Sequence, residues 1–181
     1  MFEMPVEINT NLEVPSKNYS GIKRILILGI GNILMKDEGI GVHIVHQLQE
    51  QDLPDNVEVI DGGTAGLDIL LSQEGLYKLV VIDAIKAGNK PGTIYKTKCL
   101  APQFIAGFSA GQSQISLHQL GLLDALAVAE KLNRAPEEVT IIGVEPEEIH
   151  LGLELSEPAK RSIPKVIEQV LEEIQDVIHR K

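Results

Sequence analysis

Cysteine and aromatic residues are scarce in this chain of 181 residues, which has one cysteine, no tryptophan and only 3% aromatic residues. A single cysteine cannot build a disulfide framework or a cysteine-rich zinc or iron–sulfur centre. The lack of aromatic side chains disfavours a stacking platform for single-stranded nucleic acid. The formal net charge of −10 makes a phosphate backbone a poor partner. The sequence therefore predicts no nucleic-acid partner.

Long apolar runs are also missing. No run approaches the roughly 18 residues of a membrane-spanning helix, and the N-terminus shows no basic start followed by an apolar stretch. We therefore expect no membrane partner and a cytoplasmic location. A composition of 44% hydrophobic and 23% charged residues is typical of a globular protein. We expect an arm or disordered lead over residues 1–22 and a single domain over residues 23–181.

Strand-like and helix-like segments alternate after the N-terminal arm. The patterns predict strands at residues 24–28, 57–60, 79–82, 93–98 and 139–144, and helices at 39–51, 67–72, 117–133 and from about 156 to 178. The link between the third and fourth strands is too short for a parallel crossover, so the fourth strand should be antiparallel. Its alternating lysines suit an exposed edge. Pro164 should kink the last helix or move its start later.

These patterns together predict the fold class. The alternation indicates an α/β fold, a three-layer α/β/α domain around a five-stranded, mostly parallel sheet with strand four antiparallel.

The stretch after the first strand reads Gly-Ile-Gly-Asn-Ile-Leu-Met-Lys-Asp-Glu-Gly-Ile-Gly over residues 29–41. It looks like a dinucleotide fingerprint, but Leu34 stands where the third glycine of that motif is needed. The loop also carries Asp37 and Glu38, two carboxylates that would repel a pyrophosphate. The stretch therefore favours a cation, or a group that carries one.

Acidic side chains follow three of the expected strands, namely Glu38, Asp61 and Asp83. Sites in open α/β sheets form beyond the carboxyl ends of the strands, and the ring of His118 can point back to that edge from the start of a helix. Carboxylates together with an imidazole suit a borderline divalent ion such as zinc or nickel. Asp61 has an equally plausible structural role, because an aspartate can hydrogen-bond the backbone of its own turn.

A competing motif is Gly107-Phe-Ser-Ala-Gly111, which matches the nucleophile elbow of serine hydrolases. The elbow needs a strand before the serine and a helix directly after it, and neither signal is present. A serine hydrolase that uses Ser109 is kept as an alternative. His43 and His46 lie three residues apart on an expected helix, where an exposed polar face is the favoured interpretation.

Five blocks of sequence resemble the nickel–iron hydrogenase maturation proteases, the endopeptidases that trim the C-terminus of the hydrogenase large subunit. The blocks are Leu28–Val42, Asp61–Gly66, Ile82–Ile85, Pro91–Thr93 and His118–Leu122. They occur in the family's order, from about residue 23 onward. The resemblance implies a five-stranded mixed sheet whose fourth strand is antiparallel, in agreement with the pattern above.

The resemblance also implies a site that recognises a metal ion, and a protein partner. The family's metal-contacting residues fall on Glu38, Asp83 and His118, and the partner is a hydrogenase large-subunit precursor. Nickel is expected to arrive with that substrate, and other divalent metals are expected to substitute for it. Cleavage would then be a checkpoint that requires nickel.

The resemblance does not settle the hydrolytic step. The family is grouped with aspartic-type peptidases, yet no shared-proton dyad is evident here. We favour a water that attacks the peptide carbonyl, with the metal as Lewis acid or anchor and Asp37 or Glu38 as base. The turn of Asp61, Gly62, Gly63 and Thr64 is expected to offer backbone N–H groups to the substrate. A non-enzymatic nickel carrier or chaperone for the large subunit is a second alternative.

Overall fold

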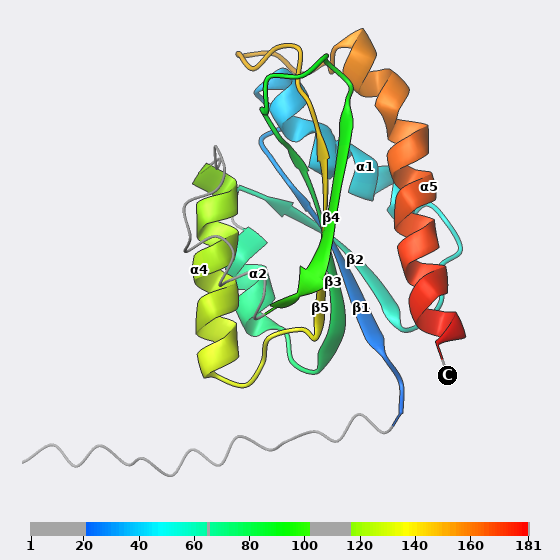
Figure 1. Ribbon diagram of the computed structural model, residues 1–181. Helices are drawn as coiled ribbons and strands as arrows, with labels where there is room; N and C mark the ends of the chain where they lie inside the picture. Colours follow the sequence, from blue (N-terminus) through cyan, green and yellow to red (C-terminus); the bar gives the residue numbers. More distant parts are fainter. Residues whose placement is uncertain (1–20, 65, 102–116, 181) are drawn as a thin grey trace, which may run out of the picture.

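The computed structural model describes residues 21–64, 66–101 and 117–180. Most of the expected N-terminal arm and the candidate nucleophile Ser109 therefore lie outside the described residues. Within those ranges the chain forms a five-stranded sheet between two layers of helices (Figure 1). The strands are β1 (Arg24–Ile30), β2 (Val57–Gly63), β3 (Leu76–Ala84), β4 (Ile94–Leu100) and β5 (Glu138–Val144). The helices are the 3-10 turn η1 (Lys36–Gly39), α1 (Ile40–Gln49), α2 (Gly66–Ser72), α4 (Leu117–Lys131) and α5 (Glu157–His179).

The sheet has the order β2-β1-β3-β5-β4. Strands β1, β2, β3 and β5 run parallel, and β4 pairs antiparallel with β5 at one edge. The predicted three-layer α/β/α architecture and the antiparallel fourth strand are confirmed. The third strand is longer than predicted, because it begins at Leu76 and includes the buried Lys78.

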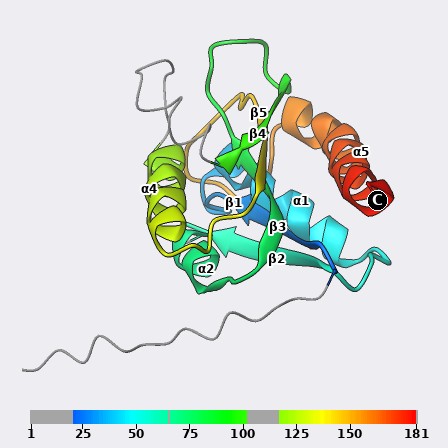
Figure 2. The same cartoon turned by 60° about the horizontal axis from the view of Figure 1, so that its bottom comes forward.

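Helices α1 and α5 cover one face of the sheet, and α2 and α4 cover the other (Figures 1 and 2). A hydrophobic core lies on each face of the sheet, and successive side chains of β1 pack into one core and then the other. Ile25 and Ile27 pack with α1 and α5, whereas Leu26 and Leu28 pack with α2 and α4. Burial on both faces explains why this strand is apolar at consecutive positions. No helix among the described residues is long and apolar enough to cross a membrane.

Helix α5 begins where its cap predicts and continues through its internal proline. The hydroxyl of Ser156 accepts a hydrogen bond from the Ala159 N–H at 3.3 Å. The expectation that Pro164 moves the helix start later is wrong, because the helix already begins at Glu157. The buried face of the helix outweighs the one backbone hydrogen bond that a proline removes. That face consists of Ala159, Ile163, Val166, Val170, Ile174 and Val177.

A buried ion-pair network joins the sheet to α5 near the amino end of β3. The ammonium of Lys78 is fully buried and contacts Glu173, which also binds Lys96 at 2.8 Å and Lys98 at 3.3 Å. The lysines of edge strand β4 are thus partly exposed and held by α5. Burial alone would raise the pKa of Glu173, but hydrogen bonds from Lys78 and Lys96 lower it to about 2. Its contribution to stability is therefore complete above pH 4.5, its ordinary pKa, and is lost as the pH falls toward 2.

Replacing one partner of this network should cost more than replacing both. We expect Glu173→Gln to lower the free energy of unfolding by about 3 kcal/mol, because Lys78 would keep a buried ammonium with a weaker partner. The double variant Lys78→Met/Glu173→Leu should recover most of that loss, since neither charge remains. Urea unfolding at pH 7 measures both. A double variant less stable than the single one would contradict this account.

Candidate active site

The carboxyl ends of β1 and β3 form the switch point of the sheet. From β1 the chain turns to β2 on one side, and it later returns to β3 on the other side. Gly29 of β1 lies opposite Asp61 of β2 and Ile82 of β3. Asp83 follows Ile82 near the end of β3. Asp61 and Asp83 therefore lie at the carboxyl ends of their strands, at the same end of the sheet as the loop after β1. Ligand sites in open α/β sheets form at such a crevice.

Two glycines allow the loop after β1 to pack tightly on the strand ends. A Cβ atom at Gly41 would lie 2.2 Å from the carbonyl oxygen of Ile82, so α1 begins in close contact with β3. Gly31 has φ of +140°, and a Cβ there would lie 1.9 Å from the carbonyl oxygen of Glu38. The glycine pattern therefore reflects close packing and a left-handed turn. It brings η1, which carries Glu38, against the end of β3.

The predicted metal ligands come from three different elements at this end of the fold. Asp83 is 2% exposed, and its Oδ1 accepts a hydrogen bond from the Ala84 N–H at 2.8 Å. Glu38 is half-buried, and no hydrogen bond or ion pair joins its carboxylate to the described part of the chain. His118 lies in the first turn of α4. Helix α4 leads back to the start of β5, so its first turn lies toward the carboxyl ends of the parallel strands (Figure 1).

The three-ligand set stays a prediction. The side chain of His118 lies outside the described residues. Among the side chains that are described, no group of three histidine, cysteine, aspartate or glutamate residues is arranged to hold a metal ion. Of the three predicted ligands, the structure describes two carboxylate side chains, those of Glu38 and Asp83, on elements that pack against each other.

Both carboxylate oxygens of Asp37, the other candidate base, accept hydrogen bonds from the protein. Its side chain is buried, and Oδ1 accepts a hydrogen bond from the Ser156 N–H at 2.7 Å. Oδ2 accepts three more, from the Ser156 hydroxyl at 2.7 Å and from the N–H groups of Glu147 at 2.8 Å and Glu148 at 3.2 Å. Burial alone would raise the pKa of Asp37, but these hydrogen bonds hold it below its ordinary value of 3.8. Asp37 therefore ties η1 to the segment between β5 and α5.

A second buried carboxylate, Glu145, fixes the loop between β3 and β4. It accepts hydrogen bonds from the N–H groups of Ala87 at 2.9 Å and Gly88 at 3.0 Å, and from the Tyr95 hydroxyl. Burial raises its pKa, but the hydroxyl and N–H donors outweigh that effect and lower it overall. The sequence interpretation missed Glu145. The sequence pattern that pointed to Asp83, an acid directly after an apolar strand, is also present at Glu145.

The turn after β2, predicted to contact substrate, lies beside the loop after β1. The N–H of Gly31 donates to the Gly63 carbonyl at 2.9 Å. The structural alternative for Asp61 is confirmed, because its Oδ1 accepts a hydrogen bond from the Gly63 N–H at 2.9 Å. Its Oδ2 lies 2.9 Å from Nε2 of His46 on the exposed face of α1. Gly62 and Thr64 flank Gly63 in the same turn, the former buried and the latter exposed.

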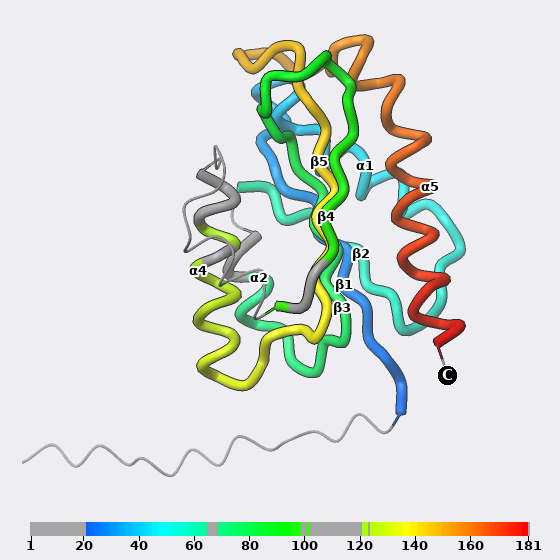
Figure 3. The backbone as a smooth tube through the Cα atoms, in the orientation of Figure 1, coloured from blue at the N-terminus to red at the C-terminus, as the bar shows by residue number. Residues whose placement is uncertain are grey.

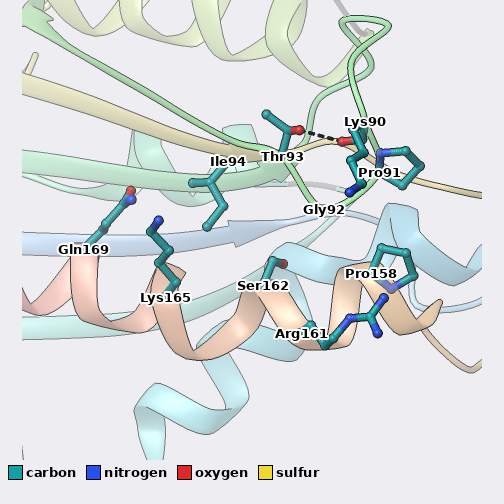
Figure 4. A pocket seen from close by; sticks show the side chains of 10 residues that line it. All are labelled: Lys90, Pro91, Gly92, Thr93, Ile94, Pro158, Arg161, Ser162, Lys165 and Gln169. Carbon is teal, nitrogen blue, oxygen red and sulfur yellow. Dashed lines mark hydrogen bonds between the residues drawn. The ribbon is translucent and has the colours of Figure 1, made fainter.

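A hollow of about 560 Å³ lies between the start of β4 and α5 (Figure 4). Its charged lining consists of Lys90, Arg161 and Lys165, and none of its lining residues is an acid or a histidine. This donor set repels a divalent cation, so the hollow is not the predicted metal site. The switch point carries the carboxylates and is the candidate active site.

Fold and site together define an α/β protein with acidic side chains at a sheet switch point, and comparison with known proteins identifies its family. The family model of hydrogenase maturation proteases matches residues 42–173. The Hydrogenase 2 maturation protease of Escherichia coli (strain K12) is 38% identical over 155 residues, or 84% of this chain and 92% of the relative. The hydrogenase expression/formation protein HupD of Rhizobium leguminosarum bv. viciae is 40% identical over 147 residues, or 80% of this chain and 71% of the relative.

Solved structures agree. The hydrogenase maturating endopeptidase HybD from E. coli superposes with a TM-score of 0.74 and 37% identity, covering 85% of this chain and 93% of that chain. The chain belongs to the hydrogenase maturation protease family, and so to the protein-cleaving hydrolases.

The Asp37 contacts predict an acid-sensitive loss of stability. We expect Asp37→Asn to lower the free energy of unfolding at pH 7 by roughly 2–3 kcal/mol, because an amide cannot accept all four hydrogen bonds. Since the folded-state pKa lies below the ordinary value of 3.8, the advantage of the wild type should be complete above that pH and shrink below it.

Urea unfolding at pH 7 and pH 3 measures this difference. Asp52→Asn, at an exposed position, is the control and should match the wild type at both. A gap between wild type and Asp37→Asn that widens in acid would contradict the proposed contacts.

Proposed function

We propose that this protein is the endopeptidase that removes the C-terminal extension of a nickel–iron hydrogenase large-subunit precursor after nickel insertion. Membership of the maturation protease family supports the class of reaction. The observation that carries the proposal to this site is the carboxylate of Glu38, which no described partner occupies, on a turn packed against β3, the strand that carries Asp83.

The nickel ion belongs to the substrate in this proposal. Glu38 and Asp83 supply carboxylate oxygens, and His118 would supply an imidazole nitrogen, which together form a donor set suited to a borderline divalent ion. A packed turn carries Glu38 and a central strand carries Asp83, so the backbone at both residues is ordered before the substrate arrives. When bound, nickel supplies an anchor for the precursor or a Lewis acid beside the bond that is cut.

The hydrolytic step uses a water molecule and one carboxylate. The water oxygen bonds to the peptide carbonyl carbon while its proton passes to the carboxylate, and the proton is then given to the departing amine as the C–N bond breaks. Glu38 is the better candidate for this base, because both oxygens of Asp37 already accept hydrogen bonds from the protein. Asp37 then acts as a positioning residue for Glu38.

The turn that ends β2 is proposed to align the substrate chain. Strand β2 is one of the two edge strands of the described sheet, which supports a role for the backbone groups of Asp61, Gly62, Gly63 and Thr64 in binding an extended peptide. The N–H of Gly63 is already bound to Asp61. The neighbouring N–H groups of the turn are therefore the ones proposed for the substrate.

The test is cleavage of a large-subunit precursor, nickel-loaded or nickel-free, with the product mass as readout. The loaded precursor should lose its extension and the nickel-free one should keep it. Equal cutting of both would end the nickel requirement. A precursor that is bound but never shortened would instead indicate a carrier or chaperone.

Three substitutions test the proposed ligands. Glu38→Gln, Asp83→Asn and His118→Ala should each slow processing by about 100-fold or more, because each removes a charge or donor that the proposal assigns to the reacting centre. Glu50→Gln, at the exposed end of α1, is the matched control and should process normally. Thermal melting checks that each variant is folded. Near-normal processing by all three would rule out the site, and loss on Ser109→Ala would favour the serine hydrolase.

A further inference from the structure

Exposed apolar side chains gather on two loops beside the candidate active site. Among the described residues, five of the large exposed apolar side chains lie on the loop after β1 and on the segment between β5 and α5. With their exposed fractions they are Ile33 (42%), Leu34 (54%), Ile149 (42%), Leu151 (80%) and Leu153 (66%). We call this set the two-loop patch. An exposed apolar cluster of this kind is typical of an interaction site.

The two loops are joined by their backbones. The N–H of Lys36 donates to the Gly152 carbonyl at 2.9 Å, and the N–H of Gly152 donates to the Leu34 carbonyl at 3.0 Å. Figure 3 shows the segment before α5 lying beside the loop after β1 at the same end of the sheet. The five side chains therefore lie on two loops that adjoin each other.

Hydrogen bonds and an ion pair tie the patch together where it meets the candidate active site. Asp37 accepts hydrogen bonds from Glu147, Glu148 and Ser156, and Lys36 pairs with Glu148 at 2.8 Å. A surface that is ordered before binding loses less conformational entropy when a partner docks. The same turn presents Leu34 and Glu38, four residues apart, so a partner on the patch lies next to the candidate active site.

Charge indicates what covers the patch. Residues 145–157 contain five glutamates and no lysine or arginine. Glu145 is buried, Glu148 pairs with Lys36, and Lys160 lies 3.8 Å from Glu154 and 3.3 Å from Glu157. Glu147 is exposed, and the side chain of Glu154 is 89% exposed. The four glutamates outside the core outnumber these two lysines, so the rim of the patch keeps an acidic excess. A second copy of this chain would bring the same acidic rim and a further net charge of −10 against it. The occupant that fits is an apolar surface flanked by lysine or arginine.

We infer that the two-loop patch docks the large-subunit precursor, through an apolar surface with basic flanks that lies close to the bond to be cut. This inference rests on the proposed function and adds a binding surface outside the ligand set. Docking on the patch fixes the precursor's position, and the carboxylates of Glu38 and Asp83 then bind the nickel ion that the precursor carries.

The test compares two pairs of substitutions of exposed apolar side chains, one pair inside the patch and one outside it. Leu34→Ser/Leu151→Ser removes the centre of the patch. Leu132→Ser/Ile178→Ser removes exposed apolar side chains elsewhere; Leu132 is 54% exposed, as is Leu34. Binding to immobilised nickel-free precursor, which is not cut, gives Kd by biolayer interferometry. Processing of nickel-loaded precursor gives kcat and KM.

The patch pair should raise Kd and KM by about tenfold or more while kcat at saturation changes little, because it removes contacts outside the reacting centre. The control pair should behave like the wild type in both assays. Added salt should weaken wild-type binding, since the flanking charges are of opposite sign.

Several outcomes would overturn the inference. One is binding and processing by the patch pair at wild-type levels, and another is wild-type binding that salt strengthens. A wild-type dimer in sedimentation velocity that the patch pair converts to a monomer would assign the patch to a second copy instead. If the wild type binds precursor without shortening it and the patch pair loses binding, the docking surface stands and the proposed peptidase function fails.

Discussion

The buried carboxylate of Asp37 is the interaction on which this end of the molecule depends. It joins η1 to a segment more than 100 residues later, with hydrogen bonds to Glu147, Glu148 and Ser156. Its neighbour Glu38 takes its position from the same contacts. A buried N–H group that loses its acceptor is costly, so the segment cannot shift without disturbing the turn that carries Glu38. The active-site turn and the two-loop patch therefore behave as one unit.

The two ends of the sheet stabilise buried charge in different ways. At the amino end of β3 the buried Lys78 and Glu173 compensate each other as an ion pair. At the carboxyl end, Asp37 and Glu145 are stabilised mainly by backbone N–H and hydroxyl groups, which carry no net charge. The negative charge of these carboxylates is therefore not cancelled locally. It favours the approach of a cation or a basic surface to the end that holds Glu38.

Strand positions, the antiparallel fourth strand and the strand-end acids could be predicted because their causes are local. Apolar periodicity marks each strand, and the short link before β4 excludes a parallel crossover. The role of Asp37 could not be predicted, since its partners become neighbours only after the sheet has formed. Glu145 could have been found by the reasoning applied to Asp83. The later start that Pro164 suggested for α5 does not occur, because burial of one face of the helix outweighs a local preference.

The glycine-rich loop shows why a motif must be interpreted with the groups it presents. Nucleotide-binding loops and this loop share a need for close approach, here visible at Gly41, whose Cβ would collide with the Ile82 carbonyl. They differ in what the loop offers, because free N–H groups favour an anion whereas a carboxylate such as that of Glu38 favours a cation. Leu34, which occupies the position of the missing glycine, is an exposed part of the two-loop patch. The residue that argues against a nucleotide is thus the one that supports a protein partner.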